Sequence, residues 1–354
     1  MSSNRPKRPV SIFTVTAVTV ALLASVNSAA YASSPRPVPV PEWARPAVAF
    51  LVDIDAVERA DFFPNQPMTR AAFKRSMNAA FGGGYSRTKG KVTAAEVSSA
   101  LVRALGLRPL SDRLATVKSP DGWDPEVKAN FGTEVVAREL GLRHDRPTTE
   151  EAKESSADDP MTQADAAFAI WKAKTDPDTW AAAALEGFAL GTYDGKRREV
   201  VKFALSLVGT PYVWGGEWTD RTPEGYPYGA QPAGGVDCSG FLWNVLQEKS
   251  AGYSPPGRGY AGWTIPERSS SAMAAATPRN KRLQLAEMKA GDIVLFAPDG
   301  RDGKASEVYH AALYLGEGWI IHSSGSRAGV SLASIAKGSW WHDRILWGRR
   351  VITN

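Results

Sequence analysis

Cys238 is the only cysteine of the sequence and the residue best suited to act as a nucleophile. It lies in the segment GGVDCSGFLWNVLQ, in which glycines precede the thiol and apolar residues at helical spacing follow it. This pattern predicts a cysteine at the N-terminus of a helix, where free N–H groups and the helix dipole lower the pKa of the thiol and can stabilise an oxyanion. A small buried core cysteine is the alternative. The polar, glycine-rich flanks favour the catalytic interpretation.

A thiol nucleophile needs a base, and His310 and His322 are placed to supply one. They lie on two consecutive expected strands that are joined by a short turn. With a three-residue turn, Leu315 pairs with Trp319 and residue 312 pairs with His322, so His310 becomes a diagonal neighbour of His322 on the same face. One imidazole can then accept the thiol proton while the other orients it. Taken singly, each histidine could instead be a satisfied core residue.

The remaining two histidines carry no such prediction. His144 falls between helices in a charged stretch, which predicts a solvent-exposed loop residue, and His342 follows two tryptophans, where stacking or surface exposure explains it. His310 and His322 lack an obvious third ligand and would form a poor zinc site. A single cysteine excludes an intrachain disulfide and a zinc site with two or more cysteine ligands. We therefore expect no metal and no cofactor.

The two halves of the chain differ in pattern. The composition of the 354 residues, 43% hydrophobic and 22% charged, is typical of a globular protein, and the length favours two domains. Residues 42–175 place apolar residues at spacings of three and four, which predicts an all-α region. Residues 197–354 begin with a helix and continue with short strands, which predicts an α+β domain, and residues 176–196 form a linker. The expected strands are residues 294–296, 311–315, 319–322 and 344–347.

The helical region contains an internal repeat. Segments that start at Met68, Val92 and Met161 align with one another without gaps, and each begins with an apolar residue followed by threonine. The threonine hydroxyl can cap the first turn of the helix that follows. Glu96 and Asp165 occupy the positions that complete a capping box. The expected capping residues are Thr69, Thr93 and Thr162.

The first copy, with its turn FFPNQPMTRAAF, resembles the S-layer homology repeat of proteins attached to the cell wall, and three copies match the usual number. The resemblance implies binding of a cell-wall polysaccharide, supported in that family by an arginine that follows the threonine. Arg70 matches this arginine, whereas Ala94 and Gln163 stand at the equivalent positions of the other copies. A helical spacer or packing region is the alternative.

The first 32 residues have the anatomy of a cleaved secretory signal: a basic start, an uncharged apolar run from Val10 to about Val26, and small residues up to Ala32. An uncleaved anchor helix is the alternative, although the run is short for a membrane span. Residues 33–41 are proline-rich and predict a semi-rigid spacer. We expect a secreted protein, extracellular or wall-associated, without stable membrane insertion. Lysine and arginine do not cluster among aromatic residues, so no nucleic-acid partner is expected.

Four motifs in the second half carry a second, more specific resemblance. The segments GTPYVWGG (209–216), VDCSGFLWNVL (236–246), AGDIVLF (290–296) and YHAALYLGEGWIIHSSG (309–325) follow in order the motifs of the NlpC-type cell-wall cysteine peptidases. This resemblance covers about residues 197–352. It implies a papain-like fold, in which the helix carrying the cysteine packs on an antiparallel sheet. It also implies hydrolysis of peptidoglycan stem peptides, typically between D-γ-glutamate and the following diamino acid.

The resemblance also implies a role for each matching residue. Cys238 matches the nucleophile, His310 the general base and His322 the third, polar position of the catalytic group. Tyr212 matches a tyrosine whose hydroxyl assists the oxyanion, with simple aromatic packing as the alternative. The residues that match the pocket for the free amino end of the stem peptide are Asp237 and Ser239.

The sequence departs from the usual pattern of the NlpC-type peptidases in two places, and two alternative functions remain. Residues 217–236 and 248–290 are long connecting stretches, and such loops are commonly lids or binding walls. Covalent cysteine catalysis is the leading hypothesis. A non-catalytic wall-binding protein with a vestigial or occluded peptidase fold is the alternative from another class. Amidase or transpeptidase chemistry with the same catalytic groups is a third, minor hypothesis.

Overall fold

The computed structural model describes residues 39–353, with gaps at 219–221, 223–225, 227–228 and 247–256. The predicted secretory signal and most of the predicted spacer lie outside the described residues. The described residues belong to one compact unit. None of the helices formed by these residues is both long and apolar enough to cross a membrane.

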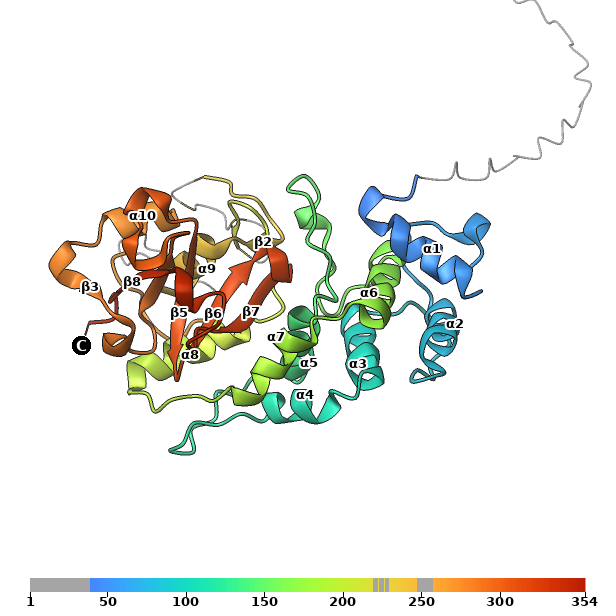
Figure 1. The fold of residues 1–354 in the computed structure, drawn as a ribbon, viewed down its shortest axis with the longest axis horizontal. Helices are drawn as coiled ribbons and strands as arrows, with labels where there is room; N and C mark the ends of the chain where they lie inside the picture. The colour runs from blue at the N-terminus through green and yellow to red at the C-terminus, as the bar shows by residue number, and fades with distance from the viewer. Residues whose placement is uncertain (1–38, 219–221, 223–225, 227–228, 247–256, 354) are drawn as a thin grey trace, which may run out of the picture. The chain divides into compact units, whose positions relative to one another are not determined.

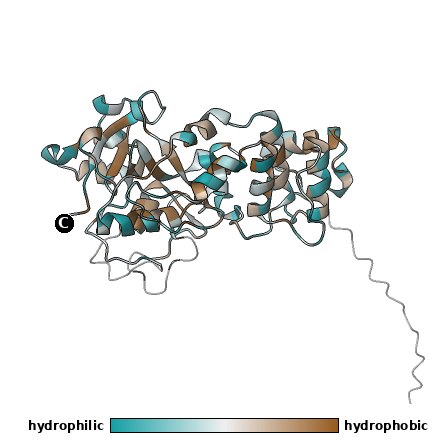
Figure 2. Ribbon diagram, turned by 90° about the horizontal axis from the view of Figure 1, so that it is seen from below, coloured by the Kyte–Doolittle hydropathy of each residue, from teal (hydrophilic) through white to brown (hydrophobic). Residues whose placement is uncertain are grey.

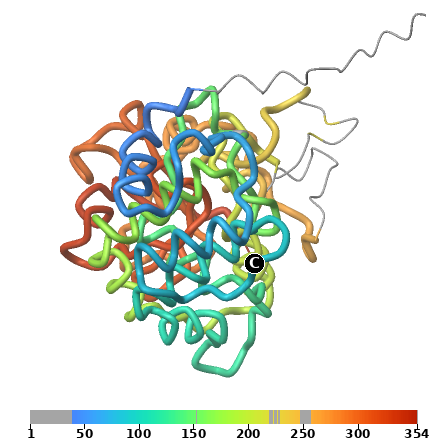
Figure 3. The backbone as a smooth tube through the Cα atoms, turned by 90° about the vertical axis from the view of Figure 1, so that its right-hand side faces the viewer, coloured from blue at the N-terminus to red at the C-terminus, as the bar shows by residue number. Residues whose placement is uncertain are grey.

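Residues 45–184 form seven helices in the order shown in Figure 1. Their cores contain mainly alanine, leucine, valine and phenylalanine at helical spacing, as the sequence pattern predicts. Figure 3 traces the first of these helices, in blue and cyan, in a second view. The helices are α1 (Arg45–Asp53), α2 (Arg70–Phe81), α3 (Ala94–Ala104), α4 (Arg108–Ala115), α5 (Phe131–Glu139), α6 (Gln163–Thr175) and α7 (Thr179–Ala184).

The starts of the three aligned segments are joined in a closed ring of backbone hydrogen bonds. The Met68 N–H donates to the Met161 carbonyl (2.9 Å), Met161 donates to Val92 (3.0 Å), and Val92 donates to Met68 (3.0 Å). Helices α2, α3 and α6 each begin directly after this ring. Their first turns are capped by the hydroxyls of Thr69, Thr93 and Thr162, as predicted.

The two predicted capping boxes have different outcomes. Glu96 completes the box at α3 by accepting from the backbone N–H of Thr93 at 3.1 Å. At α6 the Asp165 carboxylate instead accepts from the Thr162 hydroxyl at 2.6 Å and pairs with Arg146 at 2.5 Å. A buried arginine thus replaces the backbone N–H as its partner. The prediction failed because the sequence does not show that Arg146 reaches this position.

A six-stranded antiparallel sheet forms the core of the second half, in the strand order β3-β8-β4-β5-β6-β7. Helix α8 (Gly195–Ser206) precedes it, and helix α9 (Cys238–Leu246) packs against β5 and β6. Helix α10 (Ser270–Ala275) lies in the long stretch before the sheet, and β1 (Glu217–Trp218) pairs with β2 (Gly235–Val236) in a separate ribbon. The strands of the sheet are β3 (Arg282–Leu283), β4 (Ile293–Phe296), β5 (His310–Gly316), β6 (Trp319–Ser324), β7 (Gly329–Ser334) and β8 (Ile345–Arg349).

Both faces of the sheet are buried, so its strands are apolar on both sides. Leu295, Leu313 and Ile321 lie in the core that includes α9. Val294 and Ile320 lie in a second cluster on the other face. Figure 2 shows the hydrophobic residues in brown along these strands and on the helices packed against them. This explains why the strands appear in the sequence as short continuous apolar runs rather than alternating ones.

The hairpin β5–β6 differs by one residue from its predicted turn. Leu313 pairs with Ile321 as expected, but Gly316 rather than Leu315 pairs with Trp319, because the register shifts between residues 314 and 316. The turn contains Glu317 with φ of 51° between two glycines that also have positive φ. If the Leu313–Ile321 register is continued by one residue, residue 322 lies opposite residue 312, as predicted. The expected position of His322 next to His310 depends on this pairing.

A buried arginine joins the helical region to the sheet. Arg138 of α5 is fully buried, and its guanidinium donates to the carbonyls of Arg327 (3.0 Å) and Gly209 (2.8 Å). Its neighbour Glu139 accepts from the Ser331 hydroxyl of β7 at 3.0 Å. These bonds attach α5 to the edge strand of the sheet and to the turn that follows α8.

Candidate active site

Cys238 is the first residue of α9, and its side chain faces the beginning of β5. The preceding Asp237 caps the helix, because its Oδ1 accepts from the Gly240 N–H at 2.6 Å. The backbone N–H groups of Ser239, in its own helix, and of Ala311, in β5, lie close enough to the thiol to favour its ionised form. Since Ala311 directly follows His310, the helix start and the first histidine lie side by side.

The electrostatics of the thiol contradict the sequence-based prediction of a lowered pKa. Burial and the charge of Asp237 raise the pKa of Cys238 to about 12, although the N–H groups of Ala311 and Ser239 act in the opposite direction. The same carboxylate that caps the helix therefore opposes ionisation of the residue at its start. In the free protein at neutral pH the cysteine is a neutral thiol.

His310 and His322 form a hydrogen-bonded pair, with 2.8 Å between His310 Nε2 and His322 Nδ1. Both are buried, and burial lowers the pKa of His310 to about 3. Burial, together with His310 and Arg327, lowers the pKa of His322 well below its ordinary value. The Trp341 ring packs over both imidazoles, at centroid distances of 4.7 and 4.9 Å. Both rings are therefore neutral at pH 7, and the bond through Nε2 leaves Nδ1 of His310 as its remaining ring nitrogen.

Tyr212 lies within electrostatic range of the thiol. It is half-buried, and burial followed by the charges of Cys238 and Asp237 raises the pKa of its hydroxyl. The hydroxyl is therefore neutral at every physiological pH and is able to donate a hydrogen bond. The Tyr212 backbone N–H donates to the Ala328 carbonyl at 3.2 Å, which fixes this residue beside the start of β7.

Asp237 and Ser239 belong to a buried polar network. The Ser239 hydroxyl donates to Asp237 Oδ1 and accepts from Arg268, both at 2.9 Å. Asp237 Oδ2 accepts from the Gly215 N–H at 2.9 Å, and Arg268 also pairs with the buried Glu217. Sequence reasoning missed Arg268, since it lies in the long stretch before the sheet and no motif marks it.

The helical region adds negative charge to this site. Glu151 is buried, and its Oε2 accepts from the Trp214 N–H at 2.7 Å. Burial raises the pKa of Glu151, and the charges of Asp145 and Asp237 raise it further. The charges of both acidic residues, Glu151 and Asp145, also contribute to raising the pKa of Tyr212. Sequence reasoning missed them because the contact joins segments about sixty residues apart.

His144 and His342 lie away from the pair. His144 is not the solvent-exposed loop residue that was predicted: it is half-buried and stacks on Trp43 with 4.2 Å between ring centroids. Burial and the charge of Arg146 lower its pKa to about 4. His342 lies near the surface, with its Nδ1 3.2 Å from an Asp343 oxygen.

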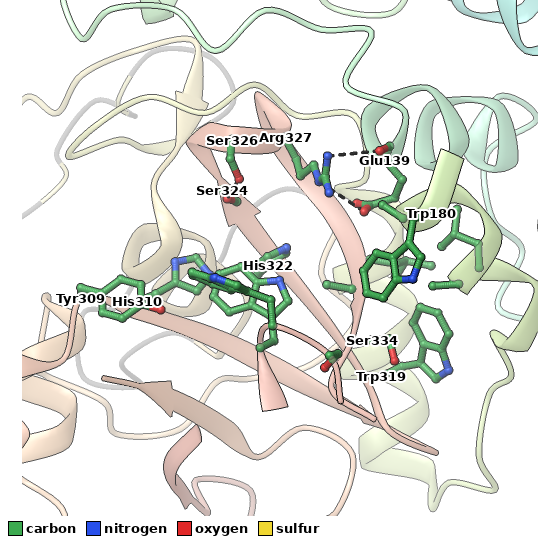
Figure 4. Close-up of a pocket in the computed structure, with 18 residues that line it drawn as sticks. Glu139, Trp180, Tyr309, His310, Trp319, His322, Ser324, Ser326, Arg327 and Ser334 are labelled. Atoms are coloured by element: carbon green, nitrogen blue, oxygen red, sulfur yellow. Dashed lines mark hydrogen bonds and ion pairs between the residues drawn. The ribbon is translucent and has the colours of Figure 1, made fainter. Parts of the chain in front are cut away.

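A cavity of about 510 Å³ adjoins the histidine pair (Figure 4). His310, His322 and Tyr309 form one side, and Trp180 of α7 stands on the other. Its far end holds the ion pair of Glu139 and Arg327, drawn with dashed lines in Figure 4. The cavity is therefore built jointly by the sheet and the helical region.

The NlpC/P60 family model matches residues 209–350, and these residues form an NlpC/P60 domain. The region is similar to the gamma-D-glutamyl-L-lysine dipeptidyl-peptidase of Bacillus subtilis, 28% identical over 143 residues, which cover 40% of this chain and 37% of that protein. It is also similar to the probable peptidoglycan endopeptidase LytE of Bacillus subtilis, 30% identical over 152 residues, covering 43% and 34%. The chain thus spans about a third of the length of these two relatives.

One similar solved structure is RipD from Mycobacterium tuberculosis, described as a non-catalytic NlpC/p60 domain protein adapted to peptidoglycan binding. It is 21% identical, covers 45% of this chain and all of that one, and has a TM-score of 0.29.

Proposed function

We propose that this protein is a peptidoglycan endopeptidase that uses Cys238 as its nucleophile and cuts stem peptides after D-γ-glutamate. The proposal rests on one observation: the Cys238 thiol at the start of α9 lies beside the start of β5, where His310 is hydrogen-bonded to His322 at 2.8 Å.

The proposed reaction begins from neutral groups. His310 Nδ1 accepts the proton of Cys238 as the sulfur attacks the amide carbonyl, so a carbon–sulfur bond forms while the S–H bond breaks. For Nδ1 to be free of hydrogen, Nε2 of His310 carries it and donates to Nδ1 of His322. His322 thereby selects the tautomer and fixes the ring, which is the part of an orienting residue.

The oxyanion and the leaving group complete the cycle. The Tyr212 hydroxyl and the backbone N–H of Cys238 stabilise the negative oxygen of the tetrahedral intermediate. Protonated His310 then gives its proton to the departing amine as the carbon–nitrogen bond breaks. Water attacks the thioester, His310 accepts the proton of that water, and the thiol is restored.

The acidic groups around Tyr212 favour a cationic end of the substrate. Asp237, Glu151 and Asp145 are close enough to raise the pKa of Tyr212, so their field also attracts an ammonium group. We infer that the free amino end of the stem peptide binds here, beside Asp237 and Ser239. Because the Asp237 and Ser239 oxygens already bond to protein groups, the attraction acts mainly through charge.

The test is digestion of purified wall and of synthetic stem peptides, with the products analysed by mass. We expect fragments with a free γ-carboxyl of D-glutamate and a new amino terminus on the diamino acid. The Cys238→Ser and His310→Ala variants should lose this activity, whereas His342→Ala, a matched surface histidine, should retain it. Products of amide cleavage at the sugar, or of peptide transfer, would assign the reaction to an amidase or a transpeptidase. A Cys238→Ser variant as active as the wild type would overturn the proposal.

We also propose that the helical region binds a cell-wall polysaccharide. A polar cleft of about 740 Å³ lies between the segment after α2 and helix α3, lined by Tyr85, Arg87 and Arg103 among others. Arg70 and Arg87 both pair with Glu96, Arg70 at 3.0 Å, so the two arginines share one carboxylate at the edge of this cleft. The Cys238→Ser protein should sediment with wall sacculi stripped of peptide, and the further substitutions Arg87→Ala and Arg103→Ala should release it. Sedimentation that is unchanged by these substitutions would favour a packing region instead.

A further inference from the structure

The cavity beside the histidine pair gathers exposed aromatic side chains. Among the described residues, four large hydrophobic side chains are exposed, and three of them line this cavity: Trp180 (68%), Trp340 (51%) and Tyr309 (44%). Exposed aromatic rings that cluster around one concave surface are typical of a ligand-binding site. The cavity is large enough for part of a small peptide.

The aromatic walls are held in place before any ligand arrives. The Arg344 guanidinium lies over the Trp340 ring at 4.0 Å, and Trp341 packs against its edge at 4.6 Å. Helix α7, which carries Trp180, is capped by Asp178, and Asp178 pairs with Arg327 at 3.0 Å. Preformed walls of this kind lose little conformational entropy on binding.

The position of the cavity identifies which half of a substrate can reach it. His310 and His322 line it, whereas Cys238, Tyr212 and Asp237 are not among the described residues that do. In the proposed reaction His310 delivers a proton to the departing amine. The leaving half of the substrate therefore lies on the histidine side, next to this cavity.

The polar groups of the cavity favour a neutral ligand. The charge of Arg327 is already taken by Glu139 at 3.3 Å and by Asp178 at 3.0 Å, so the cavity offers no free positive charge to an anionic ligand. The hydroxyls of Ser334 and Ser339 each accept from a backbone N–H at 3.2 Å, which leaves their hydrogens able to donate to a carbonyl. An anionic group would lose hydration here without gaining a counter-charge.

We propose that this cavity is the subsite for the D-alanine that follows the diamino acid in stem peptides where its carboxyl forms an amide and is therefore neutral, and that Trp180 is its specificity-determining residue. This inference rests on the proposed endopeptidase function and deepens it. Trp180 lies outside residues 209–350, so the helical region rather than the NlpC/P60 domain supplies this contact. The methyl group and the amide of D-alanine would lie between the rings of Trp180 and Trp340.

The test compares two substrates that differ by one residue. One is the tripeptide L-alanyl-γ-D-glutamyl-diamino acid as its amide, and the other carries an additional D-alanine amide. We expect the wild type to prefer the longer peptide by about tenfold in kcat/KM, a typical effect of one small apolar group in a pocket. Trp180→Ala should abolish that preference by lowering kcat/KM for the longer peptide to about the value for the tripeptide. Trp180→Phe should keep most of the preference, and Thr179→Ala, an exposed neighbour in α7, should keep all of it.

Several outcomes would overturn the inference. Equal cleavage of both peptides by the wild type, or an equal loss on both in Trp180→Ala, would reduce Trp180 to a structural residue. Inhibition by a soluble N-acetylglucosamine trisaccharide that depends on Trp180 would assign the cavity to a sugar instead.

A binding measurement separates this inference from the proposed function. The dipeptide amide of the diamino acid and D-alanine, added to full-length Cys238→Ser protein, should quench tryptophan fluorescence, and Trp180→Phe should reduce the change. Binding without cleavage of any stem peptide by the wild type would refute the proposed function and keep the subsite. Absence of binding would refute the subsite even if cleavage occurs.

Discussion

Replacement of Asp237 by asparagine should make Cys238 more reactive, because Asp237 is the charged group that opposes ionisation of the thiol. The pKa of Cys238 is raised from 9.0 to about 12, a difference of roughly three units, so its thiolate fraction at neutral pH is roughly a thousandfold lower than that of a free cysteine. Asparagine caps a helix as well as aspartate does, so α9 should persist in Asp237→Asn. Removal of one nearby charge is expected to lower the pKa of the thiol by about one unit, which is about tenfold in thiolate.

The assay is the rate of alkylation by iodoacetamide as a function of pH. The wild-type rate should rise about tenfold per pH unit throughout the range from about 6 to 9, because only the thiolate reacts. Asp237→Asn should react about tenfold faster at each pH, with unchanged slope. A rate that is high and flat across this range would show a thiolate–imidazolium pair in the free protein and refute the neutral starting state. Ser98→Ala, a buried serine control in α3 of the helical region, should leave the profile unchanged.

Three further predictions concern stability. Arg138→Ala should lower the free energy of unfolding by about 4 kcal/mol in urea titrations, since it leaves buried carboxylates and carbonyls unpaired, whereas the exposed Arg108→Ala should change it by less than about 0.5 kcal/mol. Burial raises the pKa of Glu139 from 4.5 to about 7, so the folded state binds the Glu139 proton more tightly than the unfolded state does. Protonation of Glu139 therefore stabilises the fold fully below pH 4.5, and this stabilisation is lost as the pH rises to about 7. The free energy of unfolding of Glu139→Gln should lack this pH-dependent part, about 3 kcal/mol, when unfolding is measured at pH 4.5 and at pH 7. An identical pH dependence in Glu139→Gln and the wild type would show that Glu139 is not the group responsible. Gly240→Ala should disrupt the start of α9, because its Cβ would lie 1.9 Å from the Gly216 carbonyl oxygen, while Gly187→Ala meets nothing within 4 Å and should melt like the wild type.

Local signals in the sequence were sufficient for most elements near the site. Threonine before an apolar periodic run marked the starts of α2, α3 and α6, and glycine followed by helical spacing marked α9 at Cys238. Strands β4, β5, β6 and β8 were predicted to within two residues at each end. Strand β7 was missed because its residues GVSLAS include two serines and a glycine, and much of its burial comes from contacts with the distant helix α5 and with β6.

Contacts between distant segments could not be predicted. Trp341 covers both imidazoles, and Arg268 and Glu151 surround Asp237, but each reaches the site from a loop whose course depends on the complete fold. The pKa of Cys238 was wrong for a related reason. A helix N-terminus is visible in the sequence, whereas the degree of burial, which dominates here, is a property of the folded chain.

The ring of hydrogen bonds among Met68, Val92 and Met161 links three distant segments into one closed circuit. A linear array can gain or lose a unit at either end, whereas each segment here closes the circuit of the other two. Loss of any one segment would break two of the three bonds at once. We therefore expect the three segments to form cooperatively, in contrast to the additive behaviour of open solenoids.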